Sequence, residues 1–244
     1  MSRESDTDYR AELTGLPTRD VPDYLTGRSG LPGPRANLTL MAAFAEWANA
    51  SLIEAMATRE DDYLRCCGVV GIGRLAAGTT DPGERDDIIA RLHGYASSGA
   101  WRVREAVAMA LQRLGDERPA VLRGTATDWA ADPDPLVVRA ALAGICEPRL
   151  LKDPDTARTA LAVCEAATVG LLRLPATDRR SAPARTLRQG LGYCWSVAVA
   201  GLPAEGLRRF RALQERATTS GDKDLAWIVR SNLGKARLRR LLEA

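Results

Sequence analysis

The chain has 244 residues, is 45% hydrophobic and 5% aromatic, and carries a formal net charge of +3 at pH 7. This length and apolar content allow a sizeable core, either in one domain or in one repeat array. Met1–Tyr9 is polar and acidic and lacks the apolar core of a signal peptide, and the longest nearly apolar run, 191–203, is too short to span a bilayer. We therefore expect a cytoplasmic protein without a membrane segment.

The spacing of the cysteines and the single histidine argue against the usual metal sites and catalytic triads. The five cysteines lie in apolar stretches without Cys-x-x-Cys spacing, so we expect buried, reduced thiols. The single histidine, His93, ends an expected helix and would have to serve any histidine-dependent mechanism alone. We expect no metal site and no cofactor.

The first 36 residues differ in composition from the rest of the chain. They contain Pro17, Pro22, Pro32 and Pro34 among several glycines, and no helical or strand period is visible there. This pattern predicts an extended or partly ordered N-terminal arm over residues 1–36, followed by a repeat domain over 37–244.

From residue 37 onward the apolar spacing is that of amphipathic helices, divided by glycine and proline. The breakers predict five helix pairs: 38–58 with 61–77, 84–97 with 100–114, 118–131 with 134–146, 154–174 with 181–200, and 203–218 with 222–242. In 61–77, the run Gly68-Val69-Val70-Gly71-Ile72-Gly73 lacks the Gly-Lys-Ser/Thr of a phosphate loop and predicts close helix packing.

Five arginines recur near the start of the second helix of each pair, at intervals of 39, 35, 49 and 42 residues. They are Arg65, Arg104, Arg139, Arg188 and Arg230. A period near 40 indicates a repeat array in which no unit buries its apolar face alone. The sequence therefore predicts an all-α protein.

The run Asp132-Pro133-Asp134-Pro135-Leu136-Val137-Val138-Arg139 resembles the second helix of a HEAT repeat, as do 101–111 and 224–233. The resemblance implies a right-handed α-solenoid of about five HEAT-like antiparallel helix pairs. It also implies an Asp–Arg ladder between neighbouring repeats. Two interpretations of the recurrent arginines remain open, intramolecular pairing and contact with a ligand.

Positive charge is concentrated at the C-terminal end. Residues 173–244 hold 15 Arg or Lys against 6 Asp or Glu, a net of +9, whereas residues 1–172 hold 19 against 25, a net of −6. The candidate contacts to a polyanion, of which duplex DNA is the first choice, are Arg188, Arg208, Arg209, Arg211, Arg230, Lys235, Arg237, Arg239 and Arg240. The alternative interpretation is a solvated helix face.

Four tryptophans are aromatic candidates: Trp101, Trp129, Trp195 and Trp227. Large aromatics between repeats usually fill the core. Alternatively, Trp101-Arg102-Val103-Arg104 and Trp227-Ile228-Val229-Arg230 resemble repeats of the bacterial HEAT-like alkylpurine DNA glycosylases, in which aromatics cradle a damaged nucleotide and an Asp stabilises charge on the sugar. The carboxylates to consider for that role are Asp128 and Asp132, although neither follows a tryptophan at that family's usual spacing.

These observations favour a non-catalytic HEAT-repeat scaffold that binds a protein partner or a polyanion such as DNA. The alternative is a DNA alkylation repair glycosylase. The sequence carries no indication of oligomeric state.

Overall fold

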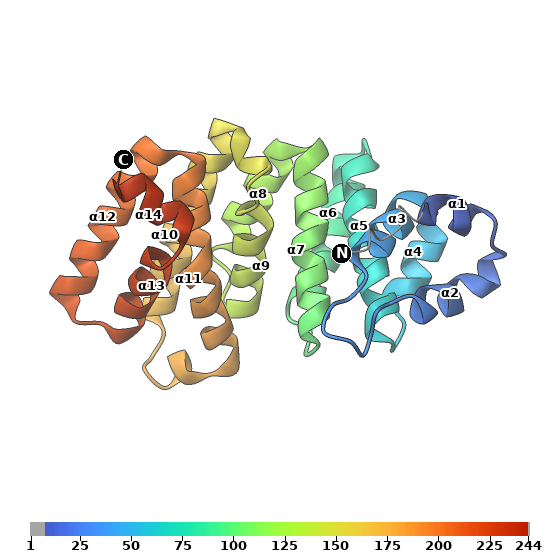
Figure 1. Cartoon of the computed structure of the whole chain (residues 1–244), viewed down its shortest axis with the longest axis horizontal. Helices are drawn as coiled ribbons and strands as arrows, with labels where there is room; N and C mark the ends of the chain where they lie inside the picture. Colours follow the sequence, from blue (N-terminus) through green and yellow to red (C-terminus); the bar gives the residue numbers. More distant parts are fainter. Residues whose placement is uncertain (1–7, 244) are drawn as a thin grey trace, which may run out of the picture. The chain divides into compact units, whose positions relative to one another are not determined.

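The computed structural model describes residues 8–243, which form two compact units divided between Arg113 and Leu114. We call residues 8–113 the N-terminal unit and residues 114–243 the C-terminal unit. Between residues 8 and 243 the structure contains fourteen α-helices, three short 3-10 segments and no strand (Figure 1). The predicted all-α class is therefore confirmed for this part of the chain.

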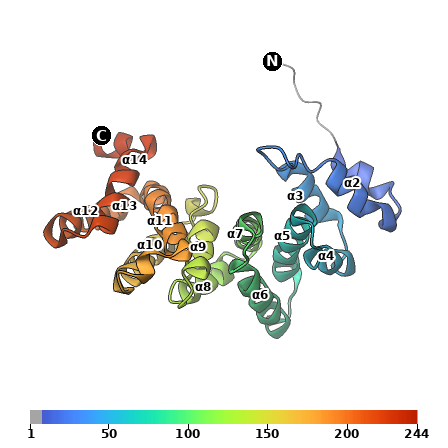
Figure 2. The same cartoon turned by 90° about the horizontal axis from the view of Figure 1, so that it is seen from below.

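The N-terminal unit is arranged around one long helix, α5 (Asp62–Gly78). Helices α2, α3, α4 and α6 all contact α5, and α1 contacts α3 (Figure 2). Their bounds are α1 (Tyr9–Thr14), α2 (Val21–Gly27), α3 (Leu38–Trp47), α4 (Ala50–Ala57) and α6 (Pro82–Ala96), and α7 (Trp101–Glu117) contributes its residues up to Arg113. Because α5 has neighbours on several sides, most of its side chains are buried.

Small residues let α5 approach its neighbours closely, as the glycine run predicts. A Cβ on Gly68 would lie 2.1 Å from the backbone nitrogen of Ala57 in α4. A Cβ on Gly73 would lie 2.5 Å from the Cα of Ala110 in α7. Both distances are too short for any side chain, so these two positions require glycine.

The prediction of an extended N-terminal arm is wrong for residues 9–27. These residues form two short helices with an intervening 3-10 turn. Leu13, Val21 and Leu25 from this segment are fully buried. Helices of six and seven residues contain too few turns to show a hydrophobic period. The prolines and glycines that suggested irregular structure include helix-terminal residues, such as Gly15 at the end of α1. Residues 1–7 of the expected arm lie outside the described residues.

The first and the last predicted helices are each divided in two. The predicted helix 38–58 is interrupted at Ala48 and Asn49, where the Asn49 side chain accepts a hydrogen bond from the Leu52 N–H and caps α4. The predicted helix 222–242 is interrupted at Gly234 and Lys235. The other predicted helices agree with the structure to within a few residues at each end.

The C-terminal unit consists of three consecutive helix pairs and a final short helix. Its elements are α8 (Pro119–Trp129), α9 (Pro135–Ile145), α10 (Pro154–Arg173), α11 (Ala182–Gly201), α12 (Pro203–Ser220), α13 (Lys223–Leu233) and α14 (Ala236–Glu243). The two helices of each pair contact one another, and the second helices α9, α11 and α13 contact in chain order (Figure 2). Helix α11 contacts every other helix of this unit from α9 to α14.

A buried asparagine joins α11 to α13. Asn232 is fully buried, its Oδ1 accepts the Ser196 N–H at 2.9 Å, and its Nδ2 donates to the carbonyls of Leu191 and Ile228. All hydrogen-bonding groups of the amide are thereby used, which offsets the cost of burying them. The bonds fix the position of α13 along α11.

The glycine contacts lead to a stability prediction. Gly68→Ala forces a methyl group against the α4 backbone and should lower the free energy of unfolding by about 1–3 kcal/mol, measured by urea titration. The control is Gly94→Ala in α6, where a Cβ meets nothing within 4 Å. Since that site is open and helical, the control should raise stability by about 0.5–1 kcal/mol. Equal effects of the two substitutions would contradict the close contact of α4 and α5.

Candidate functional site

The predicted contact residue Arg188 is engaged inside the C-terminal unit. Its Nη1 donates to Oδ1 of Asp224 at 2.5 Å, and its guanidinium lies 4.9 Å from the centre of the Trp227 ring. Next to this pair, Arg179 forms an ion pair with Asp222 at 2.6 Å. Arg188 therefore links α11 to α13, and its charge is largely compensated by Asp224.

Arg209 is a second predicted contact residue whose charge is already compensated. Its Nη2 lies 2.5 Å from Oε1 of Glu205 in α12, and its Nη1 lies 2.6 Å from Oε2 of Glu165 in α10. The hydrogen bond from Arg209 lowers the pKa of Glu205, so this carboxylate stays ionised to lower pH.

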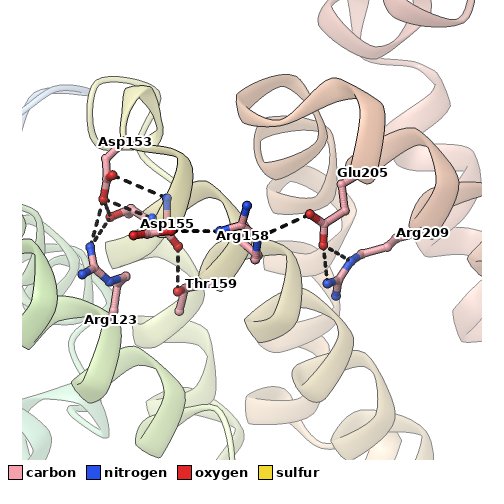
Figure 3. Close-up of polar contacts among 8 residues, drawn as sticks. Arg123, Asp153, Asp155, Arg158, Thr159, Glu205 and Arg209 are labelled. Atoms are coloured by element: carbon pink, nitrogen blue, oxygen red, sulfur yellow. Dashed lines mark hydrogen bonds and ion pairs between the residues drawn. The ribbon is translucent and has the colours of Figure 1, made fainter.

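The Arg209 pairs belong to a chain of polar contacts across α8, α10 and α12 (Figure 3). Arg123 in α8 binds Oδ2 of Asp153 at 2.9 Å, and Asp153 caps α10. Arg158 in α10 binds Asp155 at 2.8 Å and approaches Glu205 in α12 at 3.5 Å. The first helices of the three pairs are therefore linked to one another by charge.

Five predicted basic residues are exposed, and among residues 8–243 they form no ion pair. They are Arg208 and Arg211 in α12, Arg230 in α13, and Arg239 and Arg240 in α14. Helix α14 buries Leu238 against the unit, which turns the adjacent Arg239 and Arg240 toward solvent. These five side chains can meet a partner without first losing an internal one.

The two remaining predicted cations gather on an aromatic ring that the sequence analysis did not single out. Lys235 Nζ lies 5.5 Å and the Arg237 guanidinium 4.8 Å from the centre of the Tyr193 ring. Arg237 Nη2 also donates to the Tyr193 hydroxyl at 2.8 Å. Tyr193 is 44% exposed although its neighbours in α11, Gly192 and Cys194, are buried. No sequence signal marked this cluster, because the exposure of the Tyr193 ring and its contact with Arg237, 44 residues away, become visible only in the folded structure.

The four candidate tryptophans are not brought together. Trp195 is fully buried and donates from Nε1 to Oγ1 of Thr168 at 3.1 Å, and Trp129 is 6% exposed. Trp227 is half-buried under Arg188, and a Cβ on Gly192 would touch its ring. Trp101 is 55% exposed and belongs to the N-terminal unit. Three of the four therefore fill space between helices of the C-terminal unit.

The two candidate carboxylates lie at the end of α8. Asp128 is exposed, and Asp132 accepts the backbone N–H of Asp134 at 2.8 Å in the α8–α9 connection. Asp132 also lines a pocket of about 390 Å³, whose described lining is mostly alanine, valine, leucine and proline, without an aromatic ring. The described lining of this pocket therefore offers no ring beside Asp132 on which a base could stack.

Four of the five recurrent arginines interact within the protein. Arg65 donates to the Arg59 carbonyl and Arg104 to the Ser98 carbonyl, Arg139 has an internal partner, and Arg188 binds Asp224. Arg188 pairs with an aspartate of the next helix pair, as the expected ladder implies, whereas Arg65 and Arg104 bond to backbone carbonyls six residues earlier in the chain. The exposed Arg230 is the exception.

The chain matches no protein-family model, and it has no significant match among curated proteins or solved structures. The predicted burial of the five cysteines is confirmed, and none forms a disulfide with another described residue. Between residues 8 and 243, no helix combines the length and apolar character needed to cross a membrane.

The ion pairs of α13 lead to a pH prediction. Burial raises the pKa of Asp222, but hydrogen bonds from the Leu225 N–H and from Arg179 outweigh it, so the net pKa lies below the usual 3.8. A lowered folded-state pKa means that the stabilisation is complete above about pH 4 and is lost as pH falls through the folded value. Asp222→Asn should therefore cost about 1 kcal/mol near neutral pH and progressively less below about pH 4.

Urea titrations at a series of pH values measure this difference. The matched control is Asp128→Asn, which removes an exposed carboxylate of the same unit. Its effect should be within about 0.5 kcal/mol of zero at every pH. A cost of Asp222→Asn that is unchanged in acid would show that the charge of Asp222 does not matter.

Proposed function

We propose that the chain is a non-catalytic helical-repeat scaffold whose C-terminal unit binds duplex DNA through its phosphates. The observation that carries the proposal is the set of five exposed arginines that form no ion pair within residues 8–243, together with Lys235 and Arg237 beside Tyr193. Phosphate oxygens are the ligands that exposed guanidinium groups bind best, often through two parallel hydrogen bonds.

Ion pairs between consecutive helix pairs support the HEAT-like part of the proposal. Ion pairs join Arg188 to Asp224, 36 residues apart, and Arg123 to Asp153, 30 residues apart. The pair Arg91–Glu54 in the N-terminal unit spans 37 residues. Each joins one helix pair to the next, and Arg188–Asp224 is an Asp–Arg pair of the kind that the resemblance to HEAT repeats implies. We propose on this basis that the helix pairs are the repeats of a right-handed α-solenoid.

The distribution of charge favours a polyanion over a neutral partner. Internal pairing removes Arg188 and Arg209 from the nine predicted contacts, so seven cations remain. They lie on α12, α13 and the segment that includes α14. Helices packed side by side can bind successive phosphates without entering a groove, so recognition should depend little on base sequence. An acidic protein surface is the alternative partner that the same cations would suit.

The tryptophans and carboxylates favour the scaffold over the glycosylase alternative. Base excision requires an open aromatic pocket with a carboxylate directed at the sugar. Trp129 and Trp195 are buried instead, and Asp132 is engaged with the backbone of Asp134. No described feature of the C-terminal unit favours excision.

DNA titration at two salt concentrations tests the proposed binding. Each phosphate contact contributes about 0.9 to the slope of log affinity against log salt, so Arg239→Ala/Arg240→Ala should reduce this slope by about 1.8 and weaken binding at low salt. The same measurement on Arg208→Ala/Arg211→Ala determines whether α12 belongs to the interface. Fluorescence anisotropy with a labelled duplex gives both quantities.

A double variant in the other unit provides the control. Arg10→Ala/Arg19→Ala removes the same charge from exposed positions of the N-terminal unit and should leave the slope unchanged. Absence of binding by the unmodified protein at low salt would contradict the DNA proposal. A pull-down with nuclease treatment would then identify a protein partner.

A separate assay tests the non-catalytic part of the proposal. A duplex containing a methylated purine is incubated with the protein, and released base is measured by chromatography. We expect no release above the spontaneous rate. Release that is lost in Asp132→Asn, but not in a variant of equal charge such as Asp178→Asn, would establish the glycosylase alternative.

A further inference from the structure

The N-terminal unit contains a preformed apolar pocket of about 450 Å³ between α3, α5 and α7. Its inner wall includes Met41, Tyr63 and Cys66, all nearly fully buried. The Tyr63 hydroxyl donates to the Asn37 carbonyl at 2.7 Å, which holds the ring in place. A pocket of this size with rigid apolar walls is within the range of small-molecule sites.

Large apolar side chains are exposed at the pocket. Leu38 and Trp101 both line it, with exposed fractions of 54% and 55%. They are two of the four exposed large hydrophobic residues among residues 8–243, the others being Tyr193 and Leu242 in the C-terminal unit. Exposed apolar surface next to a concave apolar site is typical of a ligand site.

Two cations at the same pocket have no carboxylate partner among residues 8–243. Arg35 and Arg102 both line it, and Arg102 lies 4.5 Å from the centre of the Trp101 ring, a stacking contact that leaves its N–H groups available. The one acidic lining residue, Glu105, already interacts within the protein. The lining therefore combines an apolar interior with two available guanidinium groups.

We infer that this pocket binds a small organic acid with an apolar body, such as an aromatic or aliphatic carboxylate. The body enters between Met41, Tyr63 and Met109, and the carboxylate meets Arg102 and Arg35. Burial of the body supplies affinity in proportion to its apolar area, and the guanidinium groups select the anion. The site lies in a different unit from the proposed DNA interface, so each can fail without the other.

Calorimetric titration of the full chain with 1-naphthaleneacetate and with 1-naphthaleneacetamide tests this inference. The two probes share an apolar body and differ in charge. The acid should bind roughly tenfold more tightly than the amide, as expected for hydrogen bonds to a charged group. Arg102→Gln should remove most of this preference while leaving amide binding unchanged.

Two further variants test the apolar part of the site. Leu38→Asp alters an exposed side chain, so it should fold normally and weaken both probes. Met109→Trp should fill the pocket and abolish binding, with folding checked by circular dichroism. Arg10→Gln, an exposed arginine outside the lining, is the control and should behave as the unmodified protein.

Several results would overturn the inference. The first is that neither probe binds at millimolar concentration. The second is that acid and amide bind with equal affinity. The third is that the folded Leu38→Asp and Arg102→Gln proteins bind both probes with unchanged affinity. Absence of DNA binding together with normal probe binding would contradict the proposed function but support the inference about the pocket.

Discussion

Each unit depends on one central helix: α5 in the N-terminal unit, most of whose residues are buried, and α11 in the C-terminal unit, half of whose residues are buried. A helix surrounded by others gains apolar burial on several faces, but its neighbours must approach without collision. Small residues meet this requirement: Gly68 and Gly73 in α5, and Gly192 in α11 below the Trp227 ring. Helices α2, α3, α4 and α6 contact α5, and helices α9, α10, α12, α13 and α14 contact α11, so these two place most helices of their units.

Burial of the central helices also explains how charge is distributed over the C-terminal unit. Arginines at the junctions between helix pairs, such as Arg188 and Arg209, bind carboxylates of the neighbouring pair and hold the pairs in register. The net charge of a segment therefore overstates the charge available to a partner. The available part lies where no neighbouring helix brings an acid close, as at Arg239 and Arg240.

Two proposed binding features follow from different physical properties of the two units. The N-terminal unit presents an apolar pocket with two guanidinium groups, suited to a small ligand that is mostly removed from water. The C-terminal unit presents exposed cations on α12, α13 and α14, suited to an extended charged surface. The two proposals thus assign a small acid and a polyanion to different residues of the chain.

The sequence by itself determined the helical class and most helix boundaries, because apolar spacing and breakers such as Pro154 and Gly221 act within a few residues of chain. It also indicated the tight packing around Gly68. It did not reveal α1 and α2, whose few turns are stabilised by burying Leu13 and Leu25 rather than by local pattern. Tertiary structure alone decided which arginines pair, that Trp195 is core while Trp101 is exposed, and that Tyr193 meets Arg237 from 44 residues away. The reason is that an ion pair or an exposed ring depends on side chains from distant segments, and helical periodicity carries no information about which segments become neighbours.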